Sequence, residues 1–540
     1  PGCADRPGPA GRREREMTDR THSVKLDRDK CMGCTSCIKG CPTRAIRVRG
    51  GKARILEGLC IDCGECIRIC PHHAKSAEMD AIGRLFEFET AVALVPPSLY
   101  GQFGAPASRP MILAAVKALG FDDVEEVAAG AERVTEATIA FLSDRGNGPL
   151  PVISSACPAV VRLVQVRFPG LLDHLLPLDA PMEVAAREAR RRAVSRTGLS
   201  PDRVGVFFLS PCAAKRSAVR FPAGASRSEV DGVLSIAEVY PLILSRLDQV
   251  DPEEARAFAG RPLAGPAGVR WGNAGGEAVA LQTDRFLAVD GIHNVIDILE
   301  EIEGERLADV DFIEANACFG GCIGGPLTVA NRFAARTRMR RHLDEARSAA
   351  RAGGPFADPE AAGLQPVGRW TEPVMPNHVL RLDADIGRAM RMFEEMEAIA
   401  ARLPGLDCGA CGAPGCASLA EDIVRGEAAE TDCIVLLREQ YNRLTTGNSA
   451  GLPIHEISDR LGWRILVPPT DPDRIVSGGY ACDMLSRVVA GAGPGDAWFT
   501  ILNSLNVVAV ASLAGVACVV LAEGTAMDPP VLARAAEKGV

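Results

Sequence analysis

The sequence predicts a multidomain protein of mixed α/β and α+β class. At 540 residues the chain is longer than a single hydrophobic core usually supports, so several domains are expected. In its central part, short apolar runs alternate with longer helical patterns, which is typical of α/β units with parallel strands. All but three of the 19 cysteines fall into three groups; the exceptions are Cys3, Cys482 and Cys518. This grouping predicts additional small modules built around cofactors.

Composition excludes several classes of function. The apolar fraction of 47% and the charged fraction of 24% are near the averages for globular proteins. The net charge of −9 argues against a nucleic-acid partner. The longest apolar run, 507–521, is shorter than the roughly 20 residues of a membrane span and is predicted to form two buried strands. Residues 1–22 lack the apolar core of a secretory signal, so we expect a leader outside the native fold and a cytoplasmic protein.

The first cysteine group predicts a ferredoxin-like module over residues 23–80. It contains the run Cys-x2-Cys-x2-Cys-x3-Cys-Pro twice, which is the pattern of bacterial ferredoxins with two 4Fe-4S clusters. In this pattern the fourth cysteine of each run ligates the other cluster. The predicted ligand sets are therefore Cys31, Cys34, Cys37 and Cys70 for one cluster, and Cys60, Cys63, Cys66 and Cys41 for the other. Zinc bound by paired CxxC motifs is the alternative.

The second cysteine group follows predicted strands. Apolar runs at 91–95, 152–155, 204–209 and 312–317 are predicted strands, and the last three lead directly into Cys157, Cys212 and Cys318. Since α/β folds bind ligands in the loops after their strands, we expect these three thiols to converge on one crevice.

The motifs around these cysteines resemble the three signatures of iron-only hydrogenases. They are Ser154-Ser155-Ala156-Cys157-Pro158, Ser210-Pro211-Cys212-Ala213-Ala214-Lys215 and, in the same order as in the family, Glu314-Ala315-Asn316-Ala317-Cys318-Phe319-Gly320-Gly321-Cys322-Ile323-Gly324-Gly325. The resemblance covers about residues 90–340 and includes Pro97-Ser98 and Gly275-Gly276. It implies a two-lobed α/β hydrogenase domain, placed over residues 85–375.

The resemblance also implies a cofactor, the H-cluster. Its four-iron cubane would be held by Cys157, Cys212, Cys318 and Cys322, and Cys322 would bridge to a di-iron unit carrying CO, cyanide and a dithiolate. Lys215 would hydrogen-bond one cyanide, and Pro97 and Ser98 would contact the other. Glycines let the chain turn closely beneath the cluster; they are Gly320, Gly321, Gly324 and Gly325.

Four departures from the family pattern surround this site. Ala156 stands where catalytic members have a cysteine that relays protons, Ser210 and Asn316 replace methionines, and Ala218 replaces a glutamate. In these respects the chain resembles the sensory branch of the family. The alternative is a relative that retains the cubane but lacks the di-iron unit, as in iron–sulfur assembly proteins.

Three further segments follow. Residues 376–402 are predicted to form a packed connector helix. Residues 403–450 contain the third group and resemble the four-iron domain of the corrinoid protein of the CO dehydrogenase/acetyl-CoA synthase system, with zinc as the alternative; the ligands would be Cys408, Cys411, Cys416 and Cys433. Residues 451–540, with their Ser477-Gly478-Gly479 turn, resemble a DRTGG regulatory domain that we expect to be truncated. Its predicted strands are 464–468, 475–479, 498–501, 507–511 and 517–521.

These features predict an H2-responsive redox sensor. It would split H2 slowly at the H-cluster and pass electrons through three accessory 4Fe-4S clusters to ferredoxin or another redox carrier. Its state would be read by a kinase or phosphatase, and its assembly would need H-cluster maturation proteins. The alternatives are a catalytic, ferredoxin-linked hydrogenase and a non-catalytic iron–sulfur scaffold or electron-transfer protein without the di-iron unit.

Overall fold

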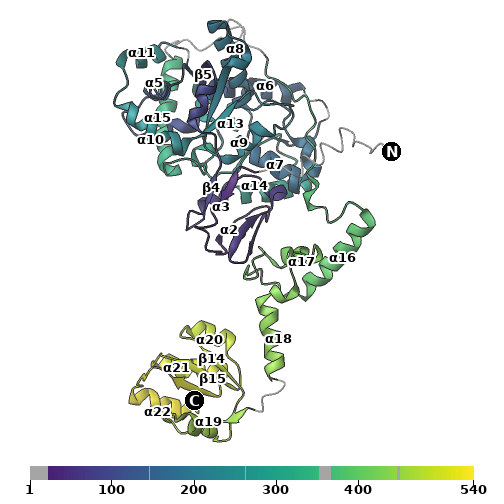
Figure 1. Ribbon diagram of the computed structural model, residues 1–540, viewed down its shortest axis with the longest axis vertical. Helices are drawn as coiled ribbons and strands as arrows, with labels where there is room; N and C mark the ends of the chain where they lie inside the picture. The colour runs from purple at the N-terminus through teal and green to yellow at the C-terminus, as the bar shows by residue number, and fades with distance from the viewer. Residues whose placement is uncertain (1–21, 145, 147, 262, 352–365, 447–450) are drawn as a thin grey trace, which may run out of the picture. The chain divides into compact units, whose positions relative to one another are not determined.

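The computed structural model describes residues 22–144, 146, 148–261, 263–351, 366–446 and 451–540, with side chains described to 441 in the fifth range. The chain divides into two compact units, Pro1–Ala429 and Glu430–Val540, which are described separately (Figure 1). The division falls inside the predicted four-iron segment, and nearly all of the predicted leader lies outside the described residues. The mixed α/β multidomain class predicted from the sequence is confirmed.

The N-terminal part of the first unit is a small α+β module with two similar halves. Strand β1 pairs with β4, and β2 pairs with β3, both antiparallel. Short helices carry the middle cysteines of each half. The elements are β1 (Val24–Leu26), α2 (Ser36–Lys39), β2 (Ile46–Arg49), β3 (Lys52–Ile55), α3 (Glu65–Arg68) and β4 (Lys75–Ala77).

The first lobe of the larger domain is built on a four-stranded parallel sheet in the order β6-β5-β8-β9. Helices cover both faces, so β5 is buried along its whole length and alternate residues enter two different hydrophobic clusters. The strands are β5 (Thr90–Val95), β6 (Asp123–Glu126), β8 (Val204–Ser210) and β9 (Gly232–Ser235). The helices of this lobe are α4 (Pro97–Tyr100), α5 (Arg109–Lys117), α6 (Val127–Asp144), α8 (Pro181–Thr197), α9 (Ala213–Arg220), α10 (Ile236–Leu247), α11 (Pro252–Ala259), α12 (Pro266–Arg270) and α15 (Arg332–Arg351).

The second lobe contains a three-stranded parallel sheet in the order β10-β11-β7. Its buried apolar residues form a cluster with the helices that follow β7 and β10. The elements are β7 (Val152–Ile153), α7 (Pro158–Arg167), α13 (Gly276–Ala280), β10 (Phe286–Asp290), α14 (Ile292–Glu303) and β11 (Phe312–Asn316). The two sheets correspond to the two lobes that the sequence predicts.

The last part of the first unit packs against the N-terminal module. Helix α16 (Ile386–Arg402) is shorter than the predicted connector, because Asp385 caps its start by accepting a hydrogen bond from the Arg388 N–H. Two of its large apolar residues, Ile386 and Phe393, are exposed, although a packed helix was predicted. Helix α17 (Cys416–Val424) carries Asp422, whose carboxylate forms a buried ion pair with Arg47 of β2.

The second unit starts with α18 (Ile434–Thr446) and continues into a small α/β module with a parallel sheet, β14-β15-β16. Two predictions are wrong here. Residues 507–511 are not a strand but lie in α21 (Leu505–Ala514), which ends at Gly515 with φ +67°. An apolar run without polar alternation fits a buried helix as well as a buried strand, and Gly515 within this run is the C-cap of the helix. Residues 464–468 form no strand; the segment ends in Pro468, and Pro469 follows it.

The predicted strand 475–479 is divided between two sheets. The remaining elements of the second unit are β12 (Leu452–Pro453), α19 (Ile454–Leu461), β13 (Ile475–Val476), β14 (Gly478–Ala481), α20 (Leu485–Gly491), β15 (Asp496–Thr500), β16 (Cys518–Leu521) and α22 (Pro529–Lys538). Among the described residues, no helix combines the length and the apolar composition needed to cross a membrane.

Candidate metal centre

Four cysteines from both lobes line one cavity. Cys157 follows β7 and precedes α7, and Cys212 follows β8 and precedes α9. Cys318 and Cys322 lie in the turn after β11. All four side chains line the same cavity, at the carboxyl ends of parallel strands. The convergence expected from the strand–cysteine pattern therefore occurs in the structure.

The turn between Cys318 and the end of this loop depends on glycine. Gly321 has φ +81°, and a Cβ there would lie 2.5 Å from the backbone nitrogen of Ala274. A Cβ on Gly325 would lie 2.4 Å from the carbonyl oxygen of Pro211. Both glycines line the cavity, whereas Gly320 and Gly324 belong to the turn but do not line it. The close approach of backbone to the cavity thus excludes side chains at Gly321 and Gly325.

The same cavity contains the other residues predicted from the resemblance. Pro97 and Ser98, in α4, line it together with Ala156 and Lys215. The Lys215 ammonium donates a hydrogen bond to the Ala156 carbonyl oxygen at 3.3 Å. The buried Ser98 hydroxyl has no hydrogen-bond partner within the described residues. A buried cation and an unsatisfied hydroxyl facing one cavity fit a bound group that carries anionic acceptors.

Burial dominates the protonation of these thiols. It raises the pKa of Cys322 to about 12, and it also raises the pKa of Cys212 and Cys318. Burial lowers the pKa of Lys215, but the charges of the four surrounding thiolates outweigh this effect, so its net pKa is raised. Because a cysteine thiol must lose its proton to bind a metal, metal binding at this site releases protons. The charge of Lys215 favours this deprotonation, since it opposes the effect of burial on the pKa of Cys322.

Only two of the four departures from the family pattern reach the cavity wall. Ala156 and Asn316 line the cavity. The Ser210 hydroxyl instead donates to the carbonyl oxygen of Cys212 at 2.7 Å and accepts from its N–H at 3.2 Å. Ala218 packs against the hydrophobic cluster on the far side of α9.

The same wall contains a pair of buried carboxyl groups for which the sequence predicted no role, although Glu314 begins the third motif. Glu277 and Glu314 both line the cavity. The Ser154 hydroxyl donates to Glu277 at 2.7 Å, and Glu314 accepts from the Asn316 side-chain amide at 2.7 Å. Burial, and then the charge of Glu314, raise the pKa of Glu277 well above its usual value. The only sequence signal was its position directly after Gly275-Gly276.

The ferredoxin-like cysteines separate into the two predicted groups. Cys41, Cys60, Cys63 and Cys66 line one small apolar cavity. In the other group, the charges of Cys34, Cys31 and Cys70 all act on Cys37, whose pKa is raised first by burial. The residues present therefore fit two cubanes with crossed fourth ligands.

The loop holding Cys60, Cys63 and Cys66 packs against the loop that holds Cys318 and Cys322. A Cβ on Gly64 would lie 2.4 Å from the Pro326 side chain, and the Arg68 guanidinium donates to the Gly324 carbonyl at 2.6 Å. The buried Asp62 carboxylate accepts hydrogen bonds from the Arg162 guanidinium at 2.8 Å and from the Ser217 hydroxyl at 2.5 Å. These contacts tie the loop to helices α7 and α9, which begin directly after Cys157 and Cys212.

Comparison with known proteins gives three family matches. Residues 89–326 match the family "Iron only hydrogenase large subunit, C-terminal domain", and residues 23–71 match the "4Fe-4S dicluster domain" family. Residues 89–326 are therefore similar to the C-terminal domain of iron-only hydrogenase large subunits. Residues 403–435 match a family described as "Putative Fe-S cluster".

Curated relatives of the chain include several hydrogenases. Iron hydrogenase 1 of Clostridium pasteurianum is 24% identical over 379 residues, which cover 57% of this chain and 65% of the relative. The periplasmic Fe hydrogenase large subunit of Nitratidesulfovibrio vulgaris is 29% identical over 221 residues, covering 37% and 51%. The chain thus spans between about half and two thirds of the length of these relatives. Chlamydomonas reinhardtii FeFe-hydrogenase HydA1, a solved structure, matches with 15% identity, a TM-score of 0.39 and coverage of 53% of this chain and 94% of that one.

Three cysteines of the third group lie at the end of the first unit. Cys408 and Cys411 lie in the loop before α17, and Cys416 is the first residue of that helix. The Cys416 N–H donates to the Asp407 carboxylate at 2.6 Å. Cys433 belongs to the second unit.

A separate grouping of His22, Cys60 and Asp62 could also hold a metal ion, but it includes a thiol of the dicluster domain.

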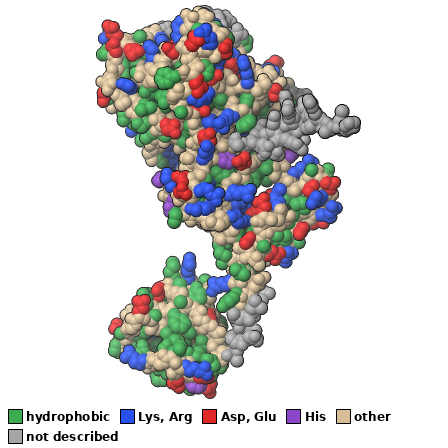
Figure 2. Space-filling view, in the orientation of Figure 1, with side chains coloured by type: hydrophobic (Ala, Val, Ile, Leu, Met, Phe, Trp, Pro, Cys, Tyr) green, Lys and Arg blue, Asp and Glu red, His purple; other side chains and the backbone are tan. Residues whose placement is uncertain are grey.

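The second unit contains a large cavity of its own. Its volume is about 870 Å³, and its lining is mainly apolar, including Trp463, Phe499 and Val519. Figure 2 shows hydrophobic side chains gathered over the visible face of this unit. Gly478 and Gly479 line the cavity, and a Cβ on Gly478 would lie 2.3 Å from the Asp496 carboxylate.

Proposed function

We propose that the chain is an H2-responsive iron–sulfur redox protein with slow H2 splitting at an H-cluster. The cluster would be held by Cys157, Cys212, Cys318 and Cys322 of the hydrogenase domain. The observation that carries the proposal is the composition of the cavity wall: it combines four thiols, the Lys215 ammonium and the unsatisfied Ser98 hydroxyl with the methyl group of Ala156. The wall therefore fits the cluster but lacks a proton carrier where catalytic hydrogenases have a cysteine.

Each residue of the wall has a defined role in this proposal. The H-cluster, when bound, supplies the redox chemistry that cleaves H2. Lys215 and Ser98 donate hydrogen bonds that orient its anionic ligands, and Pro97 helps to exclude water. Ala156 has no exchangeable proton, so proton transfer at this position would depend on another group. Since a positioned acid or base typically contributes about 10²- to 10⁴-fold, turnover should be slow.

Electrons would leave through the accessory clusters to ferredoxin or another redox carrier. We propose that two clusters are held in the ferredoxin module, residues 23–80, and one in the four-iron domain, residues 403–450. In the sequence, the hydrogenase domain at 85–375 and the connector at 376–402 lie between these two modules. The contact of Gly64 with Pro326 supports direct electron transfer between the H-cluster and the cubane predicted at Cys60, Cys63, Cys66 and Cys41. A DRTGG-like module at 451–540 would pass the redox state to a kinase or phosphatase.

Infrared spectroscopy on protein produced with H-cluster maturation enzymes tests the proposal. CO and cyanide stretching bands are expected, because the di-iron unit carries both ligands. Their absence, with iron and acid-labile sulfide present, would support a scaffold that holds only cubanes.

The sensor assignment is tested by Ala156→Cys in the matured protein. Restoring a thiol should raise the H2 oxidation rate by at least about tenfold. Ala218→Cys is the matched control, since Ala218 packs away from the cavity and should leave the rate unchanged. An unchanged rate in Ala156→Cys would show that the missing relay does not limit turnover.

A catalytic, ferredoxin-linked hydrogenase is the second candidate function. It is favoured by Glu277, whose raised pKa and hydrogen bond from Ser154 suit a proton carrier in the same wall. Fast H2 evolution by the unmodified protein, together with a large loss in Glu277→Gln, would favour this candidate over the sensor.

A further inference from the structure

We propose that Lys75 is a charge-compensating residue of the dicluster domain, which raises the reduction potential of its cubanes. The inference rests on the proposed function, since it requires 4Fe-4S clusters bound by the eight cysteines between residues 31 and 70.

The first observation is the isolation of the Lys75 ammonium. Lys75 begins β4, opposite Leu26 of β1, and its side chain is only 4% exposed. Its Nζ is buried and has no hydrogen-bond partner among the residues that the structure describes. The adjoining core is formed by apolar residues and cysteines, among them Val24, Ile46, Cys37 and Cys66. A cation in such surroundings is strongly unfavourable unless an anion lies beside it.

The second observation comes from the internal repeat. Lys75 follows Cys70 by five positions, and Ile46 follows Cys41 by the same number. Ile46 is also buried, at 2% exposure. An apolar side chain thus fills this position in the first half of the repeat, whereas the second half buries a lysine there, whose charge packing alone does not explain.

The third observation is the position of Lys75 beside thiols of both predicted ligand sets. Ala74, the residue directly before Lys75, belongs to the same buried cluster as Cys37 and Cys66, which come from different sets. The Ala74 N–H also donates to the Cys70 thiol at 3.3 Å. The Lys75 charge acts on Cys37 of one set and on Cys66 of the other. The ammonium thus favours negative charge in both clusters.

The redox consequence follows from charge balance. When a cubane with four thiolates accepts one electron, the neighbouring centre loses that electron, and the cubane becomes more negative by one charge. A fixed positive charge nearby stabilises the reduced cubane more than the oxidised one. Lys75 therefore shifts the equilibrium toward reduction in the cubanes it approaches.

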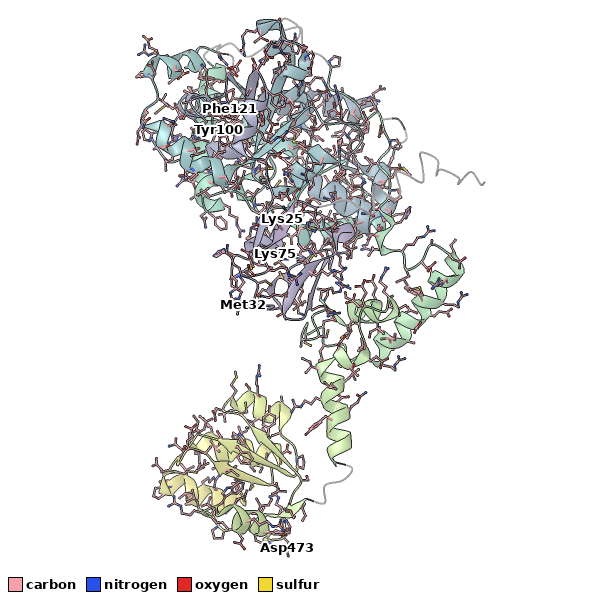
Figure 3. The ribbon with its side chains drawn as sticks, in the orientation of Figure 1. Lys25, Met32, Lys75, Tyr100, Phe121 and Asp473 are labelled. Atoms are coloured by element: carbon pink, nitrogen blue, oxygen red, sulfur yellow. The ribbon has the colours of Figure 1, made fainter. Side chains whose placement is uncertain are left out.

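Potentiometric titration followed by electron paramagnetic resonance tests this on the full-length, cluster-loaded protein. Lys75→Met should shift the reduction equilibrium of at least one cubane about tenfold toward oxidation, a potential lower by about 59 mV for one electron. Lys75→Arg should stay near the wild type. The control is Lys25→Met, on the neighbouring strand β1, where the side chain is 58% exposed and paired with Glu78 (Figure 3).

Each outcome decides the matter. Equal potentials in Lys75→Met and Lys25→Met would overturn the proposal. If Lys75→Met fails to load clusters, loading of Lys75→Arg but not of Lys75→Gln supports compensation by charge, whereas loss of loading in all three variants shows a packing role and overturns it. Wild-type protein with no cubane signal would instead refute the proposed function on which the inference rests.

Discussion

The buried ion pair between Arg47 and Asp422 should control how firmly α17 and the preceding cysteine loop stay docked on the dicluster domain. The Arg47 Nε donates to both carboxylate oxygens of Asp422, at 2.8 and 2.7 Å, and both side chains are only 4% exposed. Asp422→Leu leaves the Arg47 guanidinium buried without its anion, which costs about 3–5 kcal/mol. Since each 1.4 kcal/mol is a factor of ten, local opening of α17 should become roughly 100- to 4,000-fold more frequent.

Amide hydrogen exchange over residues 403–424 of the cluster-loaded protein measures this opening. The control is Glu421→Gln, which removes a more exposed pair with Arg425 worth at most about 1 kcal/mol. The double variant Arg47→Met with Asp422→Leu should regain most of the protection, because the remaining partner of Asp422, Arg49, is 32% exposed and can be hydrated once the carboxylate is removed. Exchange in Asp422→Leu that matches the Glu421→Gln control would refute the reasoning.

Three further predictions concern the metal centre. Asp62→Asn keeps the side-chain shape but removes the charge opposite Arg162, so denaturant unfolding should show a loss of about 1.5–3 kcal/mol, whereas the exposed Asp202→Asn should leave stability unchanged. Glu277→Gln should flatten the pH dependence of thermal stability: the wild-type carboxyl has a raised pKa in the folded state, so its contribution is retained below about pH 4.3 and declines as pH rises above it. An equal slope in both proteins would contradict that assignment. Cys41→Ser should lose one cubane, about four iron atoms by elemental analysis, while iron loss in Cys482→Ser would contradict the ligand assignment.

The fold was predictable where the hydrophobic pattern and the turn residues that follow it indicate the same secondary structure. The apolar runs before Cys157, Cys212 and Cys318 form strands as predicted. A short apolar run that is followed by turn residues is typical of a buried strand in an α/β domain. The run at 507–521 was predicted wrongly in its first half, because apolar residues without alternation fit either a buried helix or a buried strand.

The sequence by itself predicted which residues belong to the proposed metal chemistry, because cysteine spacing is set by the reach of a short loop around a cluster. It predicted the two crossed sets of four and the third motif of the hydrogenase domain. Only the tertiary structure decided what surrounds them: Glu277 and Glu314 beside Ala156, Asp62 between two helices, and the buried ammonium of Lys75. Some of these residues are far from their partners in the sequence, and others belong to no motif that would mark them as part of a site. Burial and proximity, which give them their charge state and their role, arise only when distant segments pack together.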